Sequence, residues 1–298
     1  MTKLNQANLP EGMRLERVGE LERLAIATPA VEGQVYLHGA HVAHWRPAGR
    51  QPVLWMSGQS WLEPGKPIRG GVPICFPWFG PKVNDLEAPN HGFARLRPWS
   101  LESVVRDGQG AVTVAMSLSS DRATRELWPH DFAARFTVSF SNTLEMSLAI
   151  SNTSGGGSGP AIFEEALHTY FAVGDVRQVQ VSGLAGATYI DKLDATARKT
   201  LGPAPIIVAG ETDGLYLNTT AACVLDDPSL SRRITVSKAG SNTTVVWNPW
   251  IAKSQAMPDF GDDEWPGMIC IETANAADNR VNLPPGATHV MSARITVA

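Results

Sequence analysis

The sequence is poor in cysteine and lacks long apolar runs. Its three cysteines, Cys75, Cys223 and Cys270, form no Cys-x-x-Cys pair, so neither a thiolate metal site nor a disulfide framework is expected. Buried free thiols, as in a reducing compartment, are expected instead. No stretch approaches the ~18 apolar residues of a membrane span, and the N-terminal region lacks a signal-peptide run. We therefore expect a cytoplasmic protein with no membrane partner.

Charge is also scarce. Charged residues make up 18% of the chain, below the usual ~25%, so much of the sequence can be buried. With 25 basic and 29 acidic residues the net charge is −4, which provides no positive field for nucleic acid. A small anionic ligand needs only two or three local cations. We expect a small-molecule partner, no nucleic acid, and a monomer.

Helix signals and nucleotide-binding motifs are scarce as well. One short helix is predicted over Asp121–Leu127, with Ser120 as its N-cap, and Leu193–Thr200 is a weaker candidate. The sequence shows no alternation of strands with helices, no Gly-x-Gly-x-x-Gly motif and no Walker loop. These absences argue against chemistry on dinucleotides or nucleoside triphosphates.

Alternation of apolar and polar residues dominates the chain and predicts strands. Two of them form a predicted hairpin over Phe132–Ile150, turning at Ser141–Thr143. Ser154–Gly159 is interpreted as a flexible hairpin loop rather than a linker, because the strand pattern continues on both sides. The predicted strands are Leu21–Thr28, Gln34–Leu37, Ala111–Leu118, Phe132–Phe140, Leu144–Ile150, Gln178–Val181, Gly214–Leu217, Arg233–Ser237, Thr243–Trp247, Met268–Glu272 and His289–Val297. We predict an all-β fold, a large antiparallel β-sandwich with few short helices, in one domain over residues 1–298.

Two residues have the chemistry of an acid and a base. His168 lies among aromatic residues, where a histidine is either a core residue or a general acid. Glu272 continues an apolar strand, where a carboxylate is unfavourable unless it is hydrogen-bonded or functional. Desolvation there would raise its pKa and make it a better base. Glu164 and Glu165 point to opposite faces of a strand and cannot flank one glycosidic bond unless the strand bends.

Two arginines could bind an anion. Arg69 precedes a Gly–Gly pair, which allows close approach of backbone to a ligand, and its planar guanidinium suits phosphate. Arg95 lies four residues after His91, a histidine that could bond a hydroxyl. A surface arginine beside a turn, and a structural histidine, are the alternative interpretations.

Further residues suit a sugar. Asp191 could accept hydrogen bonds from two sugar hydroxyls or belong to a charged turn. Trp247–Trp250 could stack on a pyranose or pack in the core. The regularly spaced His38, His41 and His44 do not predict a metal site, because His41 faces away from the other two in a strand.

Together these segments resemble the aldose 1-epimerase (mutarotase) superfamily, and more closely its hexose-6-phosphate mutarotase branch. The matching segments follow the family order from about Val35 to Asn275, and they read LHGAHVAHW, PIRGGVPICFPWFG, HGFAR, ALHTYF, VSGLAGATYIDKLD, VVWNPW and MICIETAN. The resemblance implies a galactose-mutarotase-like super-sandwich. It also implies acid–base interconversion of the α and β anomers of a hexose 6-phosphate, with glucose 6-phosphate the first choice. Since this exchange involves no net redox change, no cofactor is expected.

The resemblance also assigns residues to roles. His168 matches the family's general acid and Glu272 its general base. The remaining matches bind substrate: Arg69 and Arg95 as the basic residues of the phosphorylated-sugar branch, His91 in the first sugar-contact loop, Asp191 at sugar hydroxyls, and Asn90 where the branch often has Gln.

Other functions stay open at this point. A non-catalytic carbohydrate-binding or sugar-sensing sandwich would need aromatic surfaces but no acid–base pair. A free-aldose mutarotase would have no need for two cations. A glycoside hydrolase or lyase would require two carboxyl groups across a scissile bond, and none is identified.

Overall fold

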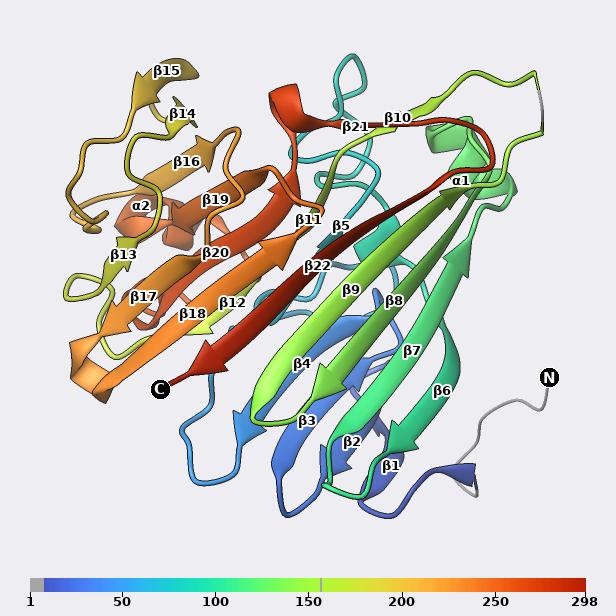
Figure 1. Ribbon diagram of the computed structural model, residues 1–298, viewed down its shortest axis with the longest axis horizontal. Helices are drawn as coiled ribbons and strands as arrows, with labels where there is room; N and C mark the ends of the chain where they lie inside the picture. The colour runs from blue at the N-terminus through green and yellow to red at the C-terminus, as the bar shows by residue number, and fades with distance from the viewer. Residues whose placement is uncertain (1–7, 156) are drawn as a thin grey trace.

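The structure is a computed structural model that describes residues 8–155 and 157–298, and most of its elements are antiparallel strands (Figure 1). The all-β prediction is confirmed. No helix in the described ranges is long and apolar enough to span a bilayer. The single domain predicted over residues 1–298 includes residues 1–7 and 156, which lie outside the described part, and it stays a prediction.

An eight-stranded sheet forms one layer of the molecule and runs in the order β13-β17-β18-β22-β9-β8-β7-β6. In β8 the even-numbered residues are apolar and buried, and they face the core. The odd-numbered residues between them are more exposed and face the other side of the sheet. The predicted hairpin is confirmed, since Phe140 pairs with Leu144 across the turn. The strands of this eight-stranded sheet are β6 (Ser100–Arg106), β7 (Val112–Ser119), β8 (Phe132–Phe140), β9 (Thr143–Asn152), β13 (Gln180–Ser182), β17 (Cys223–Asp227), β18 (Arg232–Ala239) and β22 (Thr288–Val297).

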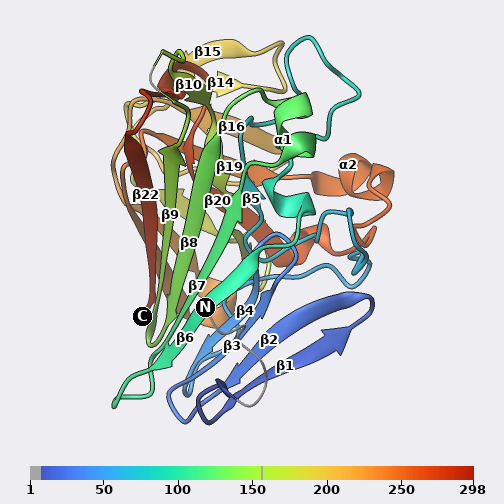
Figure 2. The same ribbon diagram turned by 90° about the vertical axis from the view of Figure 1, so that its right-hand side faces the viewer.

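A second sheet packs against the first and carries the candidate site (Figure 2). Its order is β15-β14-β16-β19-β20-β11-β5, with β12 also paired to β20. Every residue of β19 and β20 is buried, as expected for central strands covered on both faces. The strands are β5 (Ile74–Cys75), β11 (Glu165–Leu167), β12 (Tyr170–Ala172), β14 (Thr188–Asp191), β15 (Ala197–Thr200), β16 (Thr212–Tyr216), β19 (Thr243–Asn248) and β20 (Met268–Asn275).

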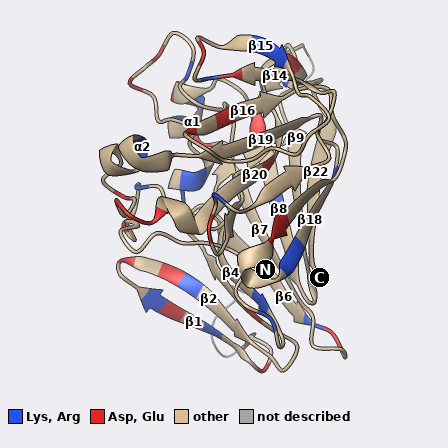
Figure 3. Ribbon diagram, turned by 90° about the vertical axis from the view of Figure 1, so that its left-hand side faces the viewer, with Lys and Arg blue, Asp and Glu red and all other residues tan. Residues whose placement is uncertain are grey.

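An N-terminal meander closes one end of the sandwich. Its strands are β1 (Met13–Val18), β2 (Leu21–Ala27), β3 (Val31–Tyr36) and β4 (His41–Pro47). Trp45 donates its indole hydrogen to the carbonyl of Ser141 in the β8–β9 turn. Gly33 lies against Phe140, where an added Cβ would come within 2.7 Å of the ring. Strands β1 and β2 carry charges of both signs (Figure 3).

The helices differ from their predictions in three ways. Helix α1 (Arg122–Leu127) is capped by Asp121 rather than Ser120, because the Asp121 carboxylate accepts from the Thr124 amide in a capping box. The candidate Leu193–Thr200 is wrong, since its second half is strand β15 paired with β14. Helix α2 (Trp250–Ala256) was not predicted. Short 3-10 helices are η2 (Ala94–Leu96), η3 (Pro228–Leu230), η4 (Trp265–Gly267) and η5 (Ala277–Asn279).

The glycine-rich segment Ser154–Gly159 is a connection but not a hairpin loop. Gly156 lies outside the described residues. The segment leads from β9 to β10 (Ala161–Phe163), which pairs with β21 (Val281–Leu283) and not with β9. The continuing strand pattern therefore marked a change of sheet.

A buried ion pair joins the two layers. Glu165 of β11 is fully buried, and its Oε1 lies 2.8 Å from Nε2 of His289 in β22. The same oxygen accepts from the Asn275 side chain at 2.9 Å. The hydrogen bond to Glu165 raises the pKa of His289. This pair couples the stability of the sandwich to pH.

We expect the sandwich to lose stability as the pH rises from about 6 to about 9, by more in the wild type than in His289→Gln. A raised folded pKa means that stabilisation is complete below the unfolded histidine value of ~6.5 and is lost as pH rises through the folded value. Urea unfolding at both pH values measures the difference. Equal pH slopes in the two proteins would remove His289 from this role.

Candidate active site

Sheet register places His168 opposite Glu272. The last residue of β11 pairs with Thr273 and the first residue of β12 pairs with Cys270. Both pairings share one register, so His168, in the break between β11 and β12, lies across from Glu272. Opposed residues of antiparallel strands project to the same face. The two candidate catalytic side chains therefore meet because of strand pairing, although they are distant in sequence.

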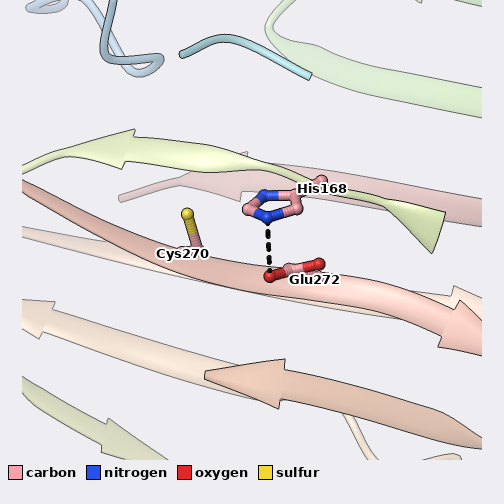
Figure 4. Close-up of side chains that lie close together, drawn as sticks. All are labelled: His168, Cys270 and Glu272. Atoms are coloured by element: carbon pink, nitrogen blue, oxygen red, sulfur yellow. Dashed lines mark ion pairs between the residues drawn. The ribbon is translucent and has the colours of Figure 1, made fainter. Parts of the chain in front are cut away.

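The two side chains touch. His168 Nε2 lies 3.3 Å from Glu272 Oε1 (Figure 4), and both residues are buried. Burial, together with the charges of Arg95 and Arg69, holds the pKa of His168 well below its usual range. Burial raises the pKa of Glu272 well above its usual range, against the opposing charge of Lys192. An acid–base couple held in a desolvated site is typical of catalytic centres.

These side chains border a cavity of about 300 Å³, a size suited to one small ligand. Its walls combine aromatic rings with charges of both signs. The lining residues are Arg69, Phe79, Asn90, His91, Arg95, His168, Tyr170, Lys192, Asp213, Val245, Trp247, Lys253, Met257 and Glu272. Six of the seven predicted site residues are thus brought together, all except Asp191.

His91 presents one ring nitrogen to this cavity. Its backbone has φ 62°, a left-handed conformation stabilised by the bond from its amide to the Gly80 carbonyl. Its Nδ1 accepts from the Gly80 amide at 3.2 Å, so in the neutral ring Nε2 carries the proton. Burial and the charge of Arg95 hold the pKa of His91 well below its usual range. His91 is therefore a neutral hydrogen-bond donor beside His168, whose ring centroid lies 5.5 Å away.

Arg95 has unused hydrogen-bonding capacity. One terminal nitrogen donates to the Asn90 carbonyl at 2.7 Å, which fixes the side chain in the loop before η2. Its buried Nε has no hydrogen-bond partner within the described part of the chain. A buried guanidinium nitrogen without a partner is costly unless a ligand supplies one.

Arg69 is held in place by its own neighbours. Its Nε and Nη2 donate to the two carboxylate oxygens of Asp259 at 3.2 and 3.1 Å, a fork-to-fork pair. Its Nη1 donates to the Tyr170 hydroxyl at 3.0 Å. The Tyr170 ring stacks on His168 with centroids 4.8 Å apart. Arg69 is thus pre-organised at the cavity, and only part of its donor set is free for a ligand.

Asp191 does not line the cavity, and register explains why. Asp191 pairs with Gly214, whereas the preceding residue, Asp213, pairs with Trp247. Successive residues of a strand face opposite sides of the sheet, so Asp213 projects toward the site and Asp191 projects away. The Asp191 carboxylate instead accepts from Lys199 at 2.7 Å. The prediction for Asp191 is therefore corrected: the carboxylate at this side of the cavity belongs to Asp213.

The cavity is also lined by two lysines, Lys192 and Lys253, that were not predicted from the sequence. Lys192 lies 3.6 Å from Asp213 and 4.7 Å above the centroid of the Phe79 ring. Lys253 projects from α2 and pairs with Glu211 at 2.9 Å. Lys192 follows directly after Asp191, so the sequence pattern indicated the right segment but the neighbouring residue. Lys253 had no signal, since α2 was not predicted.

Comparison with known proteins agrees with this geometry. The family model for aldose 1-epimerase matches residues 22–296. The chain belongs to the aldose 1-epimerase family. The resemblance read from the sequence is confirmed, and the protein is an isomerase that interconverts sugar anomers.

Relatives of this aldose 1-epimerase carry a narrower name. A protein of Escherichia coli (strain K12), provisionally named a glucose-6-phosphate 1-epimerase, is 37% identical over 89% of this chain and 86% of its own length. One of Cenchrus ciliaris with the same provisional name is 36% identical over 85% of this chain and 77% of its own. The crystal structure of a protein from Salmonella typhimurium (YeaD), provisionally named a mutarotase, superposes with a TM-score of 0.91 at 34% identity. That comparison covers 99% of this chain and 96% of the other.

Proposed function

We propose that this epimerase interconverts the α and β anomers of glucose 6-phosphate by acid–base ring opening in the cavity around His168 and Glu272. The observation that carries the proposal is the 3.3 Å approach of the imidazole and the carboxylate in a cavity that also exposes several cations. The provisional names of the relatives support the phosphorylated substrate.

The chemistry follows from what anomer exchange requires. The two groups are close enough to share one proton, and the reactive form has that proton on His168 and an ionised Glu272. Glu272 then takes the proton of the anomeric hydroxyl while His168 gives its proton to the ring oxygen, and the bond between C1 and the ring oxygen breaks. The open-chain aldehyde rotates about its C1–C2 bond and presents the other carbonyl face. The ring closes as both proton transfers reverse. Each positioned acid or base contributes about 10²–10⁴-fold to such a reaction.

The remaining lining residues would position the sugar. Arg95, Arg69 and Lys253 supply cations for the 6-phosphate, and Arg95 has the unpartnered Nε. His91 and Asn90 would bond hydroxyls, and Trp247 gives an aromatic wall. We further propose that the enzyme works in the cytoplasm, because its three free cysteines are all buried, as in a reducing compartment. We propose a monomer as the working form, because one chain supplies all the residues that line the cavity.

The experiment that tests the proposal is the decay of optical rotation of freshly dissolved α-glucose 6-phosphate. We expect the protein to accelerate this decay far above the spontaneous rate. The same assay on glucose, galactose and mannose, each with and without 6-phosphate, defines the preferred sugar. A protein that binds these sugars without accelerating any of the decays would instead be a sugar-binding sandwich.

Asp213 and Asp191 form a matched pair for testing the hydroxyl contact. We expect Asp213→Asn to lower kcat/KM by about 10–100-fold, because a hydrogen bond to a charged group contributes about 1.5–3 kcal/mol. Asp191→Asn should keep kcat/KM within about threefold of the wild type, because Asp191 lies on the opposite face of the sheet and does not line the cavity. A threefold change corresponds to only about 0.6 kcal/mol in the barrier. A larger loss in Asp191→Asn than in Asp213→Asn would reverse the assignment.

A further inference from the structure

A cysteine that the proposed reaction does not use lies beside the catalytic pair, behind the residues that line the cavity. Cys270 lies two residues before Glu272 on β20, so both project to the same face of the sheet. Cys270 pairs with Trp247 on one side and with Tyr170 on the other. It is fully buried, and its thiol is free. Figure 4 shows the sulfur beside the imidazole and the carboxylate.

Three different ligand atoms converge at this point. A ring nitrogen of His168, the Cys270 sulfur and a carboxylate oxygen of Glu272 all lie within 4.8 Å of one another. Tetrahedral zinc, with bonds of about 2.0–2.3 Å to nitrogen, oxygen and sulfur, places its ligand atoms roughly 3.3–3.8 Å apart. The 3.3 Å separation of His168 Nε2 and Glu272 Oε1 already meets this spacing. A tetrahedral site requires the Cys270 sulfur to come closer to the other two ligand atoms than the present limit of 4.8 Å.

The carboxylate also has a vacant acceptor. Glu272 is 1% exposed, and its Oε2 has no hydrogen-bond partner in the described ranges. A buried polar atom without a partner is costly, and a bound cation would satisfy it. The open side of the cavity would supply the fourth ligand as water.

We propose that His168, Cys270 and Glu272 form an inhibitory site for a thiophilic divalent cation such as Zn²⁺. The ion displaces two protons, that of the thiol and the one shared by His168 and Glu272, and both protons leave to solvent. The bound ion with its thiolate and carboxylate is therefore neutral overall. The neighbouring arginines therefore repel the occupied site little. The neutral imidazole supplies the third bond. While the ion is bound, the acid and the base are both occupied.

The affinity should be moderate. Imidazoles in dedicated zinc sites donate their other nitrogen to a carboxylate or carbonyl. The Nδ1 of His168 has no such partner among the residues that the structure describes. Burial also raises the pKa of the Cys270 thiol, which the ion must deprotonate. We expect reversible, micromolar binding rather than a permanent structural metal.

Cobalt substitution tests the site without any reference to activity. Co²⁺ added to the metal-free wild type should give a thiolate-to-cobalt charge-transfer band and the visible bands of a tetrahedral ion. Cys223→Ala, which removes a buried thiol of the other sheet, should keep them, and Cys270→Ala should lose the charge-transfer band. No such band in the wild type, or a band that persists in Cys270→Ala, would overturn the proposal.

Inhibition is the second readout, and it alone rests on the proposed function. Zn²⁺ should stop anomerisation by the wild type, and EDTA should restore it. In Cys270→Ala, scaled to its own metal-free rate, the inhibiting concentration should rise at least about 10-fold, equivalent to losing about 1.4 kcal/mol of binding. Equal sensitivity of the two proteins would contradict the site. If the cobalt bands form but no sugar is turned over, the metal site stands and the proposed function fails.

Discussion

Glu272→Gln is expected to slow the anomerisation of glucose 6-phosphate by about 10³-fold while leaving the protein folded. The amide matches the carboxylate in shape but cannot take the anomeric proton, and a lost general base costs about 10²–10⁴-fold. Glu272 is buried in a strand whose residues are all buried. A neutral amide is easier to bury there than a carboxylate, so we expect no loss of thermal stability.

The matched control is Glu145→Gln, the same chemical change on the exposed face of β9, where Glu145 pairs with Arg294. That variant should retain the wild-type rate. His168→Gln should fall by a similar factor to Glu272→Gln, because it removes the other proton carrier. Polarimetry or NMR exchange gives the rates, and thermal unfolding monitors the fold. A Glu272→Gln enzyme with more than about a hundredth of the wild-type rate would lack the loss of at least about 10²-fold and would contradict the role of general base.

Arg95→Met is expected to separate phosphorylated from free sugar. Methionine retains the aliphatic stem but removes the cation and the unpartnered Nε. Charge-assisted hydrogen bonds contribute about 1.5–3 kcal/mol, so kcat/KM for glucose 6-phosphate should fall about 10–100-fold. The value for free glucose should change little, since free glucose offers no phosphate to this group.

Arg97→Met is the matched control, because it makes the same chemical change in the same loop at an arginine that does not line the cavity. Arg97 follows η2 directly but forms an ion pair with Asp121, outside the residues that line the cavity. We expect this variant to treat both sugars as the wild type does. If Arg95→Met lowers kcat/KM equally for glucose 6-phosphate and glucose, Arg95 positions the site in general and the phosphate is bound elsewhere.

The sequence predicted the fold class, which the structure confirms, and it singled out the two residues that the structure brings into contact. Alternation is strong in strands with one solvent face, and the predicted Phe132–Phe140 has the bounds of β8. Glu272 stood out because a carboxylate interrupts a run of apolar residues, and burial of β20 on both faces is the physical reason. Its nearness to His168 depends on the shared register of β11 and β12 with β20, which no local pattern reports.

The incorrect predictions have the same cause: they depend on contacts between segments that are distant in the sequence or on local bonds that the residue types alone do not decide. Choosing between Asp191 and Asp213 requires knowing which face of each strand covers the site, and that is set by the pairing of β14 with β16. Ser120 and Asp121 are both good N-caps, and only the bond to the Thr124 amide distinguishes them. Lys253 reaches the cavity from α2, a helix of seven residues whose aromatic start was interpreted as sugar-stacking surface.

The central claim is that His168 and Glu272 act as one unit on one sugar. Its most direct test is a double-mutant cycle on the rate of anomer exchange, measured by NMR exchange spectroscopy on glucose 6-phosphate at equilibrium. Groups that act together are non-additive, so the double variant should be about as slow as the slower single variant. A double variant slowed by the product of the two single effects would show that the imidazole and the carboxylate act independently, and would contradict this account.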